Sequence, residues 1–577
     1  MTIAVRPADF RLGEPAFPRA TPAQAAARAA EAGIVQFRLM VVMLMFIGVT
    51  AVIALRLVWL LAIVGRPDAG RPADAFLPKR ADMVDRNGTP LATTINAWYI
   101  AIQPHKVIGD KPTIAAALAR IMPERSAAQY LAILNGRRKF MYLRRRAVPE
   151  LVAAVNAIGE PGIVYDREEE RLYPQGALAS HMIGYTDLDG KGAAGLEREL
   201  ETRLLDTRLR GTPLALSMDA RVQQTLEAEL AKAMAHFSAI GAAGVVMDVK
   251  TGEVLAMTSL PELNPNAPGK GSMEARFNRA TLGVYELGST FKPFTVAMAM
   301  DSGIVTSFGQ TYDCPRGLRV GRFTITDTHP FGRACTVAEI MQESSNIGTA
   351  QIAAQVGPER QREFLRRMHF LEPVSVELRE RGRTLTPGAN WGQIATMTVG
   401  YGHGIAVTPL HLATGYATLF NGGLWRPATL LKTGPGHPVP AGERVFTAET
   451  SDRMRALLRL VVMKGTGKNA DAPGYRVGGK TGTAEKILNG RYTHGAVVTS
   501  FAGVFPMDDP RYVVIAMLDE PKATKETYGF HTAGWNVAPV ISRVIARIGP
   551  LLGMIPDTSR EADMGDVLRY IHEKEAK

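Results

Sequence analysis

The sequence predicts an α+β protein in which one membrane-spanning helix precedes two folded bodies, the second a sheet flanked by helices. Three observations support this fold class. A 26-residue apolar run lies at Leu39 to Val64. Two apolar runs around a turn, typical of a hairpin, occupy Ala242 to Leu260. Strand-like and helical runs then follow to Met554. A chain of 577 residues holds three or four units of roughly 150 residues.

The composition excludes several classes of protein. With 46% apolar and 21% charged residues, the chain has enough apolar material for large cores, so it is not disordered. The net charge of +12 suits an anionic surface or a membrane, but the basic residues are scattered, which argues against nucleic-acid binding. Two cysteines exclude a disulfide scaffold. No Cys-x-x-Cys or His-Glu-x-x-His occurs, so no metal site is predicted.

The apolar run is long enough to cross a membrane. At 1.5 Å per residue it spans about 30 Å of hydrocarbon, and Arg56 is its only charge. A buried core helix of this length would show a polar face, and a cleaved signal peptide would have a shorter leader than 38 residues. We therefore expect an uncleaved anchor at residues 39–64.

Charge alone does not orient this helix. Residues 1–38 carry five Arg, while Arg66, Arg71, Lys79 and Arg80 follow the helix closely, so the positive-inside rule is nearly balanced. The compartment must therefore be decided by the chemistry of the following bodies.

Along the chain, turn and periodicity signals divide the soluble part. A Pro- and Ala-rich linker at Arg66 to Arg80 precedes a turn at Asn87-Gly88 between two strand-like runs. The later elements are expected as helices at 290–302, 337–356 and 538–554, and as strands at 475–486, 496–505 and 512–518. Residues 112–158 show helical periodicity, 171–192 are loop-rich, and 561–577 form a polar tail without a recognisable function.

Three short motifs follow one another in the second body. They are Ser289-Thr290-Phe291-Lys292, Ser344-Ser345-Asn346 and Lys480-Thr481-Gly482-Thr483. A chain of this length should contain on the order of one chance Ser-x-x-Lys and one chance Ser-x-Asn, so either of these two motifs alone is better explained as a helix-cap serine with a solvated lysine. Their occurrence together and in this order is the informative observation.

The residue types of the first two motifs suit nucleophilic catalysis. Ser289 opens a helical stretch, so Lys292 lies one turn on, on the same face. A lysine can take the serine proton only if burial or a second cation, for which Lys480 is the candidate, favours its neutral form. Ser344 offers a hydroxyl that relays protons, and Asn346 an amide that can donate to and accept from a peptide.

The third motif lies in a strand-like run. An exposed edge strand can bind an extended peptide by backbone pairing, and Gly482 allows close approach. Thr481, Thr483 and Lys480 are suited to a carboxylate. We therefore expect a substrate that is peptide-like and carries a terminal carboxylate.

The three motifs together resemble those of the serine penicillin-binding proteins. The resemblance to the class B members covers about residues 80–545 and includes Arg80 with DRNG (85–88), RLYP (171–174), ASHMIGYTD (179–187), GLE (195–197), YELGSTFKPF, SSNIGTA, YGHGIAVTPLHLA, VGGKTGTAEK and SFAGVFP. Glu286 and Ala484-Glu485-Lys486 favour the FtsI-type cell-division branch over the elongation relatives.

This resemblance implies a domain order. A cytoplasmic tail (1–38) and a transmembrane helix (39–64) would precede an elongated pedestal of the dimerisation type (65–235). A transpeptidase domain (236–555) with an antiparallel sheet flanked by helices and a polar tail (556–577) would follow. The body would lie in the periplasm, anchored by one pass in the inner membrane at the division septum.

The resemblance also implies a mechanism. Ser289 would be the nucleophile and Lys292 its base, Ser344 would pass a proton to the departing D-alanine, and Asn346 would hold the substrate amide. The N–H groups of Ser289 and Thr483 would form the oxyanion hole. Lys480, Thr481 and Thr483, with Gly482 between them, would bind the carboxylate.

Stem peptides of peptidoglycan would be cross-linked by acyl transfer without a cofactor or metal, and β-lactams would block the serine. A septal glycan polymerase of the FtsW type and other division proteins would be partners.

Other functions are weighed against this one. Gly474 to Thr481 matches the P-loop pattern, but a P-loop should follow an apolar strand and open a helix. A β-lactamase or β-lactam sensor would need a carboxylate base, and Glu485 to Asn489 matches such a pattern in the wrong place. A catalytically silent scaffold is disfavoured because all three motifs are intact.

The two cysteines remain open. Cys314 and Cys335 flank a segment that reads as a hairpin whose ends could meet. In an oxidising compartment a bond between them would close a loop of about 20 residues. Two buried unpaired thiols fit the sequence equally well.

Overall fold

The computed structural model describes residues 22–62, 79–209, 211–488 and 491–572. The chain forms two compact units, Met1–Phe76 and Leu77–Lys577. Most of the expected linker at 66–80, residues 1–21 of the expected tail and the last five residues of the chain lie outside the described residues.

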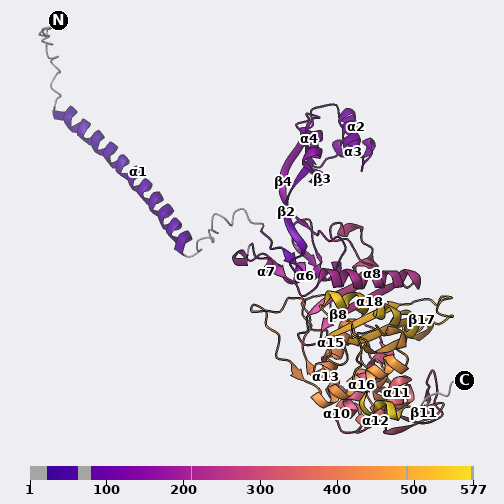
Figure 1. The fold of residues 1–577 in the computed structure, drawn as a ribbon. Coiled ribbons are helices and arrows are strands. Elements are labelled where there is room, and N and C mark those ends of the chain that lie inside the picture. Colours follow the sequence, from indigo (N-terminus) through magenta and orange to yellow (C-terminus); the bar gives the residue numbers. More distant parts are fainter. Residues whose placement is uncertain (1–21, 63–78, 210, 489–490, 573–577) are drawn as a thin grey trace, which may run out of the picture. The chain divides into compact units, whose positions relative to one another are not determined.

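The first unit contains one long apolar helix, α1 (Pro22–Ala62) (Figure 1). Its segment Gly33–Trp59 contains an 18-residue window with a mean hydropathy of 2.6, none of which is buried, so the segment is long and apolar enough to cross a membrane. The expected apolar helix is confirmed. It begins before Leu39 because residues 23–30 are mostly alanine, the strongest helix former.

The second unit begins with a small sheet whose long strands project from the rest of the unit (Figure 1). The strand order is β3-β2-β1-β7, and β4 also pairs with β2. The strands are β1 (Met83–Val84), β2 (Pro90–Ile102), β3 (Met141–Ala147), β4 (Ile163–Leu172) and β7 (Leu214–Ala215). The expected turn at Asn87-Gly88 is confirmed, because β1 and β2 pair in antiparallel fashion across it.

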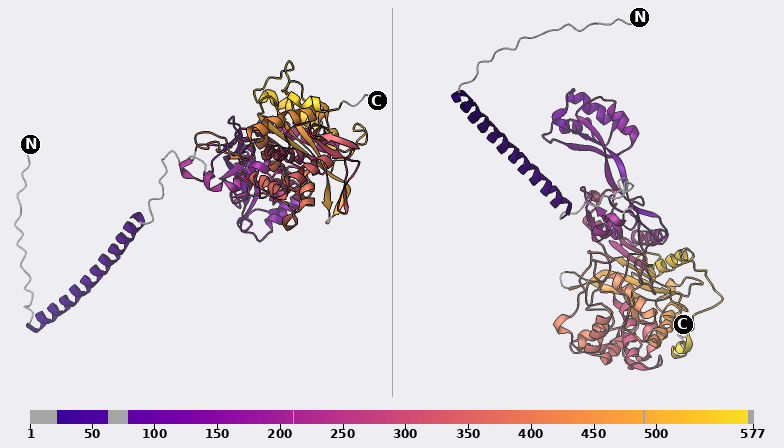
Figure 2. Two further views of the ribbon diagram at one scale, coloured as in Figure 1. Left: turned by 90° about the horizontal axis from the view of Figure 1, so that it is seen from below. Right: turned by 90° about the vertical axis from the view of Figure 1, so that its left-hand side faces the viewer.

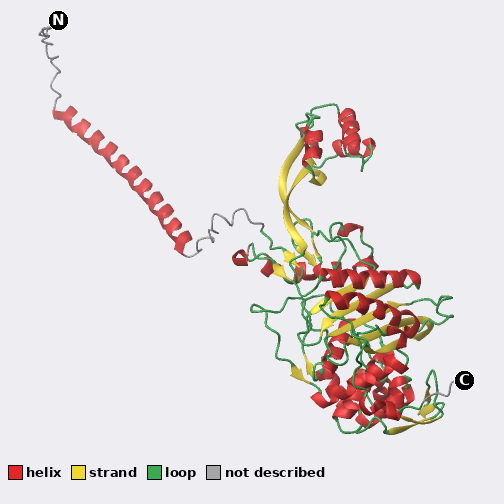
Figure 3. Ribbon diagram, viewed as in Figure 1, coloured by secondary structure: helices red, strands yellow, loops and turns green. Residues whose placement is uncertain are grey.

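Three helices cover the far end of this sheet, as Figure 3 shows. They are α2 (Lys111–Ile121), α3 (Ala127–Leu134) and α4 (Pro149–Asn156). Buried apolar side chains such as Ile100, Leu118, Tyr130 and Val155 form a separate core here. This end of the unit therefore has its own apolar core, distinct from those around the second sheet.

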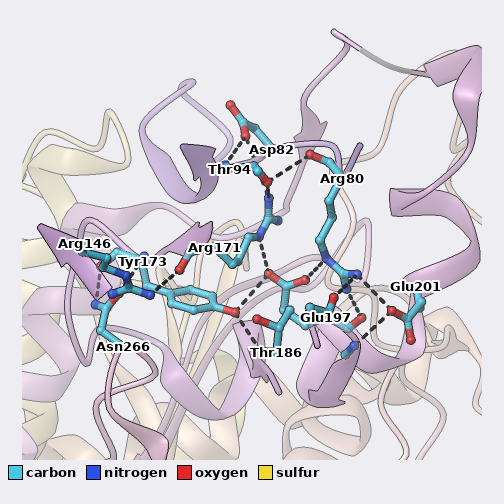
Figure 4. A network of polar contacts seen from close by, with 12 residues as sticks. Arg80, Asp82, Thr94, Arg146, Arg171, Tyr173, Thr186, Glu197, Glu201 and Asn266 are labelled. Atoms are coloured by element: carbon cyan, nitrogen blue, oxygen red, sulfur yellow. Dashed lines mark hydrogen bonds and ion pairs between the residues drawn. The ribbon is translucent and has the colours of Figure 1, made fainter. Parts of the chain in front are cut away.

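A buried ionic cluster stands at the base of the long strands (Figure 4). The fully buried Glu197 accepts hydrogen bonds from Arg80 Nε and, at 2.7 Å, from Arg171 Nε. Tyr173 is anchored nearby, because its N–H donates to Asn266 Oδ1 at 3.1 Å. A buried carboxylate needs such partners to offset its lost hydration. The motifs around residues 80, 171 and 197, far apart in sequence, thus meet at one point.

The larger part of the second unit is built on a five-stranded antiparallel sheet. Its order is β16-β17-β18-β8-β9. The strands are β8 (Gly241–Asp248), β9 (Val254–Leu260), β16 (Gly478–Leu488), β17 (Arg491–Phe505) and β18 (Tyr512–Asp519). The expected hairpin at 242–260 is confirmed as β8 and β9. Residues separated by more than 200 positions are therefore neighbours in the sheet.

Helices cover both faces of this sheet, and Figure 2 shows the layers from two further sides. On one face α8 (Ala220–His236) and α18 (Ala538–Leu551) bury residues such as Leu226 and Ile541. On the other face α15 (Pro409–Phe420) packs on β8 and β18. The expected closing helix at 538–554 corresponds to α18.

Further helices surround the two sheets. These helices are α5 (Ser180–Ile183), α6 (Gly195–Glu199), α7 (Glu201–Leu204), α9 (Met273–Arg276), α10 (Lys292–Asp301), α11 (Val337–Gln342), α12 (Asn346–Val356), α13 (Pro358–Arg367), α14 (Gln393–Gly400), α16 (Ala448–Lys464) and α17 (Ala533–Asn536). Figure 1 shows α6 and α7 at the base of the long strands and α10, α11, α12, α13 and α16 at the opposite end of the unit. Short strand pairs complete the unit: β5 (Tyr185–Thr186) with β6 (Gly192–Ala194), β10 (Thr311–Cys314) with β13 (Arg333–Thr336), β11 (Leu318–Val320) with β12 (Phe323–Ile325), and β14 (Leu424–Trp425) with β15 (Glu443–Arg444).

Two features differ from simple expectation. The segment at 337–356 is two helices rather than one, because Ser344 adopts a left-handed backbone conformation with φ +63° between α11 and α12. The polar C-terminal segment is not a loose tail over its described part. Its 3-10 helix η8 (Gly565–Tyr570) buries Val567 completely, and Glu561 pairs with the buried Arg459.

The two cysteines form a disulfide. Cys314 and Cys335 lie on the paired strands β10 and β13 with their Cα atoms 5.9 Å apart. Both are fully buried. Of the two alternatives left open by the sequence, the structure contains the bonded one.

Candidate active site

Ser289 lies in a 3-10 turn that leads directly into a helix. The turn η5 (Gly288–Phe291) is followed by α10, whose first residue is Lys292. Gly288 has φ +55°, which glycine adopts without steric cost. A Cβ atom on Gly402 would come within 2.0 Å of the Gly288 carbonyl oxygen, so the loop around Gly402 lies directly against the serine turn.

Two lysine side chains converge on one hydroxyl. Lys292 Nζ donates to Ser344 Oγ at 3.1 Å and Lys480 Nζ donates to it at 2.9 Å. Lys292 also donates to the Ser344 carbonyl oxygen. In the described part of the chain, neither lysine makes a hydrogen bond to the hydroxyl of Ser289. The three motifs are therefore linked through Ser344.

Burial disfavours the protonated, charged form of both lysines. Both are fully buried. Burial lowers the pKa of Lys292 well below its usual range, and the charge of Lys480 lowers it further, while Asp327 acts in the opposite sense. Burial lowers the pKa of Lys480 to about 7. A neutral amine near pH 7 is what a hydroxyl nucleophile requires of its base.

Ser344 and Asn346 stand on either side of a helix start. The φ of +63° at Ser344 costs on the order of 1–3 kcal/mol for a residue other than glycine, and such strain concentrates at functional sites. Asn346 is the first residue of α12, and its Nδ2 donates to the Thr326 carbonyl oxygen at 3.0 Å. The amide of Asn346 is thereby fixed in orientation.

The third motif lies on β16, an edge strand of the five-stranded sheet. A Cβ atom on Gly482 would come within 2.3 Å of the Leu287 carbonyl oxygen, so the strand approaches the serine turn as closely as glycine permits. Thr483 Oγ1 accepts from the Ala533 N–H at 3.1 Å. Thr481 shares a hydroxyl–hydroxyl bond of 2.8 Å with Thr466.

These elements enclose a cavity of about 320 Å³. Its walls include Ser289, Ser344, Asn346, Thr481 and Thr483. The two lysines reach the same place through their bonds to Ser344, and Gly482 lies between the two threonines. All eight residues predicted from the sequence are thus brought together. Residues from elsewhere in the chain also line the cavity, namely Thr328, His329, Glu343, His403, Gly465, Thr466, Lys468, Asn469, Thr532, Ala533, Gly534 and Trp535.

The sequence motifs did not reveal these additional residues. They come from loops and from short helical segments such as α17, whose position depends on the whole fold. Of the stretches that carry the family resemblance, only YGHGIAVTPLHLA contains one of them, His403. Burial lowers the pKa of His403, and the charge of Lys292 lowers it further, so its imidazole is biased to the neutral form.

The geometry excludes a P-loop. Lys480 and Thr481 lie inside strand β16, whereas the lysine of a P-loop opens a helix. Glu485 also lies on β16 and lines a neighbouring cavity with Tyr285 and Glu286. The arrangement instead suits acyl transfer, with a nucleophile, a neutral amine, a relay hydroxyl and a strand edge for an extended peptide.

Comparison with protein families gives two matches in this chain. Residues 242–542 match the penicillin-binding protein transpeptidase domain. Residues 76–212 match the penicillin-binding protein dimerisation domain. The probable peptidoglycan D,D-transpeptidase FtsI of Caulobacter vibrioides is 41% identical over 486 residues, which are 82% of each chain. The Escherichia coli FtsI is 30% identical over 524 residues, 84% of this chain and 86% of that protein.

Solved structures give the same picture. Penicillin-binding protein 3 of Mycobacterium tuberculosis, complexed with aztreonam, superposes with a TM-score of 0.64 at 26% identity and covers 83% of this chain and 97% of its own. The transpeptidase domain of Burkholderia pseudomallei penicillin-binding protein 3 gives a TM-score of 0.53 at 34% identity, with 59% and 97% covered.

Proposed function

The chain belongs to the class B penicillin-binding proteins, with a dimerisation domain before a transpeptidase domain, and from this premise we propose a role for each residue of the cavity. The protein is a peptidoglycan D,D-transpeptidase of the FtsI type, a serine acyltransferase that β-lactams target. The observation that carries the proposed roles is the convergence of two buried lysines on the Ser344 hydroxyl, in the cavity that Ser289 lines.

The first half of the reaction forms an acyl-enzyme. Lys292, neutral because it is buried, takes the Ser289 proton as the hydroxyl oxygen attacks the carbonyl of the penultimate D-alanine. The N–H groups of Ser289 and Thr483 stabilise the oxyanion, an effect usually worth several kcal/mol. The C–N bond breaks, and the proton passes from Lys292 through Ser344 to the amine of the departing D-alanine, which restores the neutral lysine.

The second half transfers the acyl group to an amine of a neighbouring stem. The acceptor nitrogen attacks the ester, loses its proton through the same lysine and hydroxyl, and the Ser289 oxygen takes that proton as the ester breaks. The products are one new amide and the free enzyme. No change of oxidation state is involved, and the peptide bond that breaks supplies the energy of the one that forms.

Substrate binding uses the strand edge and the helix start. Lys480, Thr481 and Thr483 bind the terminal carboxylate, and Gly482 lets the stem run close to β16. The Oδ1 atom of Asn346 accepts from a substrate amide, because its Nδ2 already donates to Thr326. Peptidoglycan stems and β-lactams share the carboxylate and the amide carbonyl that these groups recognise.

We propose the cellular arrangement from the same premise. The tail (1–38) is cytoplasmic, the helix (39–64) spans the inner membrane, and the pedestal (65–235), transpeptidase domain (236–555) and C-terminal segment (556–577) lie in the periplasm at the septum. Helix α8 lies at the end of the proposed pedestal and packs on the sheet of the proposed transpeptidase domain, so the two domains share a core at their boundary. An FtsW-type glycan polymerase and other division proteins are the proposed partners.

The test is covalent labelling of the full-length protein in detergent with a fluorescent penicillin. We expect one stable adduct, mapped by mass spectrometry to the peptide containing Ser289. Ser289→Ala and Lys292→Ala should both lose it, the first for want of a nucleophile and the second for want of a base. An adduct that survives Ser289→Ala would refute the assignment, and one shed within seconds would indicate a hydrolase.

A further inference from the structure

A loop closed by the disulfide reaches over the start of α12. The disulfide loop, residues 315–334, leaves β10 after Cys314 and enters β13 at Arg333, two residues before Cys335. Because its two ends are both paired as strands and bonded covalently, its base is fixed. Beyond the β11–β12 hairpin the loop carries Thr326 and Asp327, which point to the second catalytic motif.

Asp327 accepts three hydrogen bonds from three consecutive residues at the start of α12, Ser345, Asn346 and Ile347. Its Oδ2 accepts from Ser345 Oγ at 2.6 Å. Its Oδ1 accepts from the backbone N–H groups of Asn346 at 2.5 Å and Ile347 at 3.1 Å. These are among the first N–H groups of α12, which have no partner inside the helix, and a carboxylate there also suits the positive end of the helix dipole.

The neighbouring residue of the loop holds the Asn346 side chain. The Thr326 carbonyl oxygen accepts from Asn346 Nδ2, so the amide oxygen is left to face the substrate. Ser345, bonded to Asp327, also caps α12 by accepting from the Gly348 N–H at 3.0 Å. The disulfide loop thus holds, by hydrogen bonds, the backbone of Asn346 and Ile347 and the side chains of Ser345 and Asn346.

We propose that Asp327 is a positioning residue of the transpeptidase reaction, holding the start of α12 so that the Ser344 hydroxyl and the Asn346 amide keep the spacing that the acyl donor requires. This inference rests on the proposed function of the cavity. Asp327 touches no reacting atom itself. It acts through the motif it binds, and a displacement of about 1 Å in such a group can cost 100-fold in rate.

The charge of Asp327 provides a readout that a merely structural role would not move. The charged groups that act on Lys292 are Lys480 from β16 and Asp327 from the disulfide loop, and Asp327 raises the Lys292 pKa against the effect of burial. His403 lies within range of the Lys292 charge and is itself biased to the neutral form. Loss of the Asp327 charge therefore lowers the Lys292 pKa and makes the neutral base available at lower pH.

The experiment measures the second-order rate constant for acylation by a fluorescent penicillin between pH 5.5 and 9, with full-length protein in detergent. Asp327→Asn is the test and Asp313→Asn the matched control, since Asp313 is an exposed carboxylate at the base of the same loop. Thermal unfolding of each variant gives the folded fraction. Asp327→Glu keeps the negative charge but displaces the carboxylate, so it separates the effect of the charge on the Lys292 pKa from the effect of the hydrogen bonds to the start of α12.

For Asp327→Asn we expect a fall in the plateau rate of roughly 10- to 100-fold, with the acid limb of the pH profile moved to lower pH. Asp327→Glu should keep the wild-type acid limb with a reduced plateau, and Asp313→Asn should match the wild type. A wild-type rate in folded Asp327→Asn would overturn the proposal. So would a loss that only follows the folded fraction with an unmoved acid limb, because that would assign Asp327 to helix capping alone. Failure of wild-type protein to label at Ser289 would instead refute the proposed function.

Discussion

Burial of the two lysines in the cavity favours their reactivity as bases and lowers the stability of the fold. Lys292 and Lys480 have no exposed surface, and in the described part of the chain no carboxylate forms an ion pair with either of them. A buried amine without an ion-pair partner favours the neutral form and destabilises the fold when it is protonated. The property that makes them useful as bases is therefore a cost to the folded state.

Replacement of Lys480 by methionine should stabilise the protein while abolishing acylation. The Lys480 pKa is about 7 in the fold, below the unfolded value near 10.5, so the unfolded chain binds more protons between these values and wild-type stability rises with pH there. Below pH 7 the full penalty, on the order of a few kcal/mol, is present. We expect Lys480→Met to raise Tm by roughly 2–4 °C at pH 7.

The gap in Tm between Lys480→Met and wild type should narrow as the pH approaches 10, where unfolding no longer takes up the proton. Lys250→Met, at an exposed lysine, is the control and should leave Tm unchanged. Differential scanning calorimetry across this pH range is the measurement. A variant that is less stable than wild type at pH 7 would show that the hydrogen bonds of Lys480 outweigh its burial.

At the scale of an element, the position of strand β16 depends on Gly482, which has no side chain. A Cβ atom on Gly482 would meet the Leu287 carbonyl oxygen at 2.3 Å and Ser500 Oγ at 2.8 Å. A contact to backbone at 2.3 Å cannot be relieved by a rotamer change, so any larger residue must push the strand and the serine turn apart. The spacing of Ser289 and Thr483, the proposed oxyanion hole, depends on that contact.

Gly482→Ala should therefore impair catalysis more than stability. We expect acylation by a fluorescent penicillin to fall by about 100-fold, because the donors of the oxyanion hole no longer fit one oxygen. Gly503→Ala on the adjacent strand is the control, since its Cβ would make only ordinary contacts from 3.4 Å. Equal acylation rates of the two variants in stopped-flow measurements would contradict this account.

The same scale shows what the sequence could and could not predict. The hairpin of β8 and β9 and the helix α18 were predictable because period and turn residues are local signals. The break between α11 and α12 was not, because no local signal in the sequence marks the left-handed conformation that Ser344 adopts there. The eight motif residues were found by their order. Asp327 was missed because a lone aspartate in a loop carries no local signal for its partners Ser345, Asn346 and Ile347.

For the whole molecule, the apolar helix and the chemistry of the cavity together imply a topology. The helix α1 is consistent with a single-pass anchor, and the proposed substrate lies outside the cytoplasm. Charge flanking the helix is nearly balanced and gives no orientation by itself. The side of the membrane on which the second unit resides is therefore open to direct measurement.

We expect the second unit to be accessible from the periplasm. Protease added to spheroplasts should degrade the part of the chain after α1, whereas a cytoplasmic marker protein in the same sample should survive. Immunoblotting against an epitope in residues 79–572 is the measurement. Survival of that epitope until the membrane is broken would place the unit in the cytoplasm and contradict the proposed substrate.

The strand order of the large sheet has a consequence for biosynthesis. β8 and β9 are made first, yet their neighbour β18 and the lysine-bearing β16 follow more than 200 residues later. A ribosome adds residues one at a time from the N-terminus, so Ser289 is synthesised long before Lys480. If the second unit lies in the periplasm as proposed, the nascent enzyme would carry an inert serine while it crosses the membrane. It becomes reactive toward wall precursors or antibiotics only when its final strands have arrived.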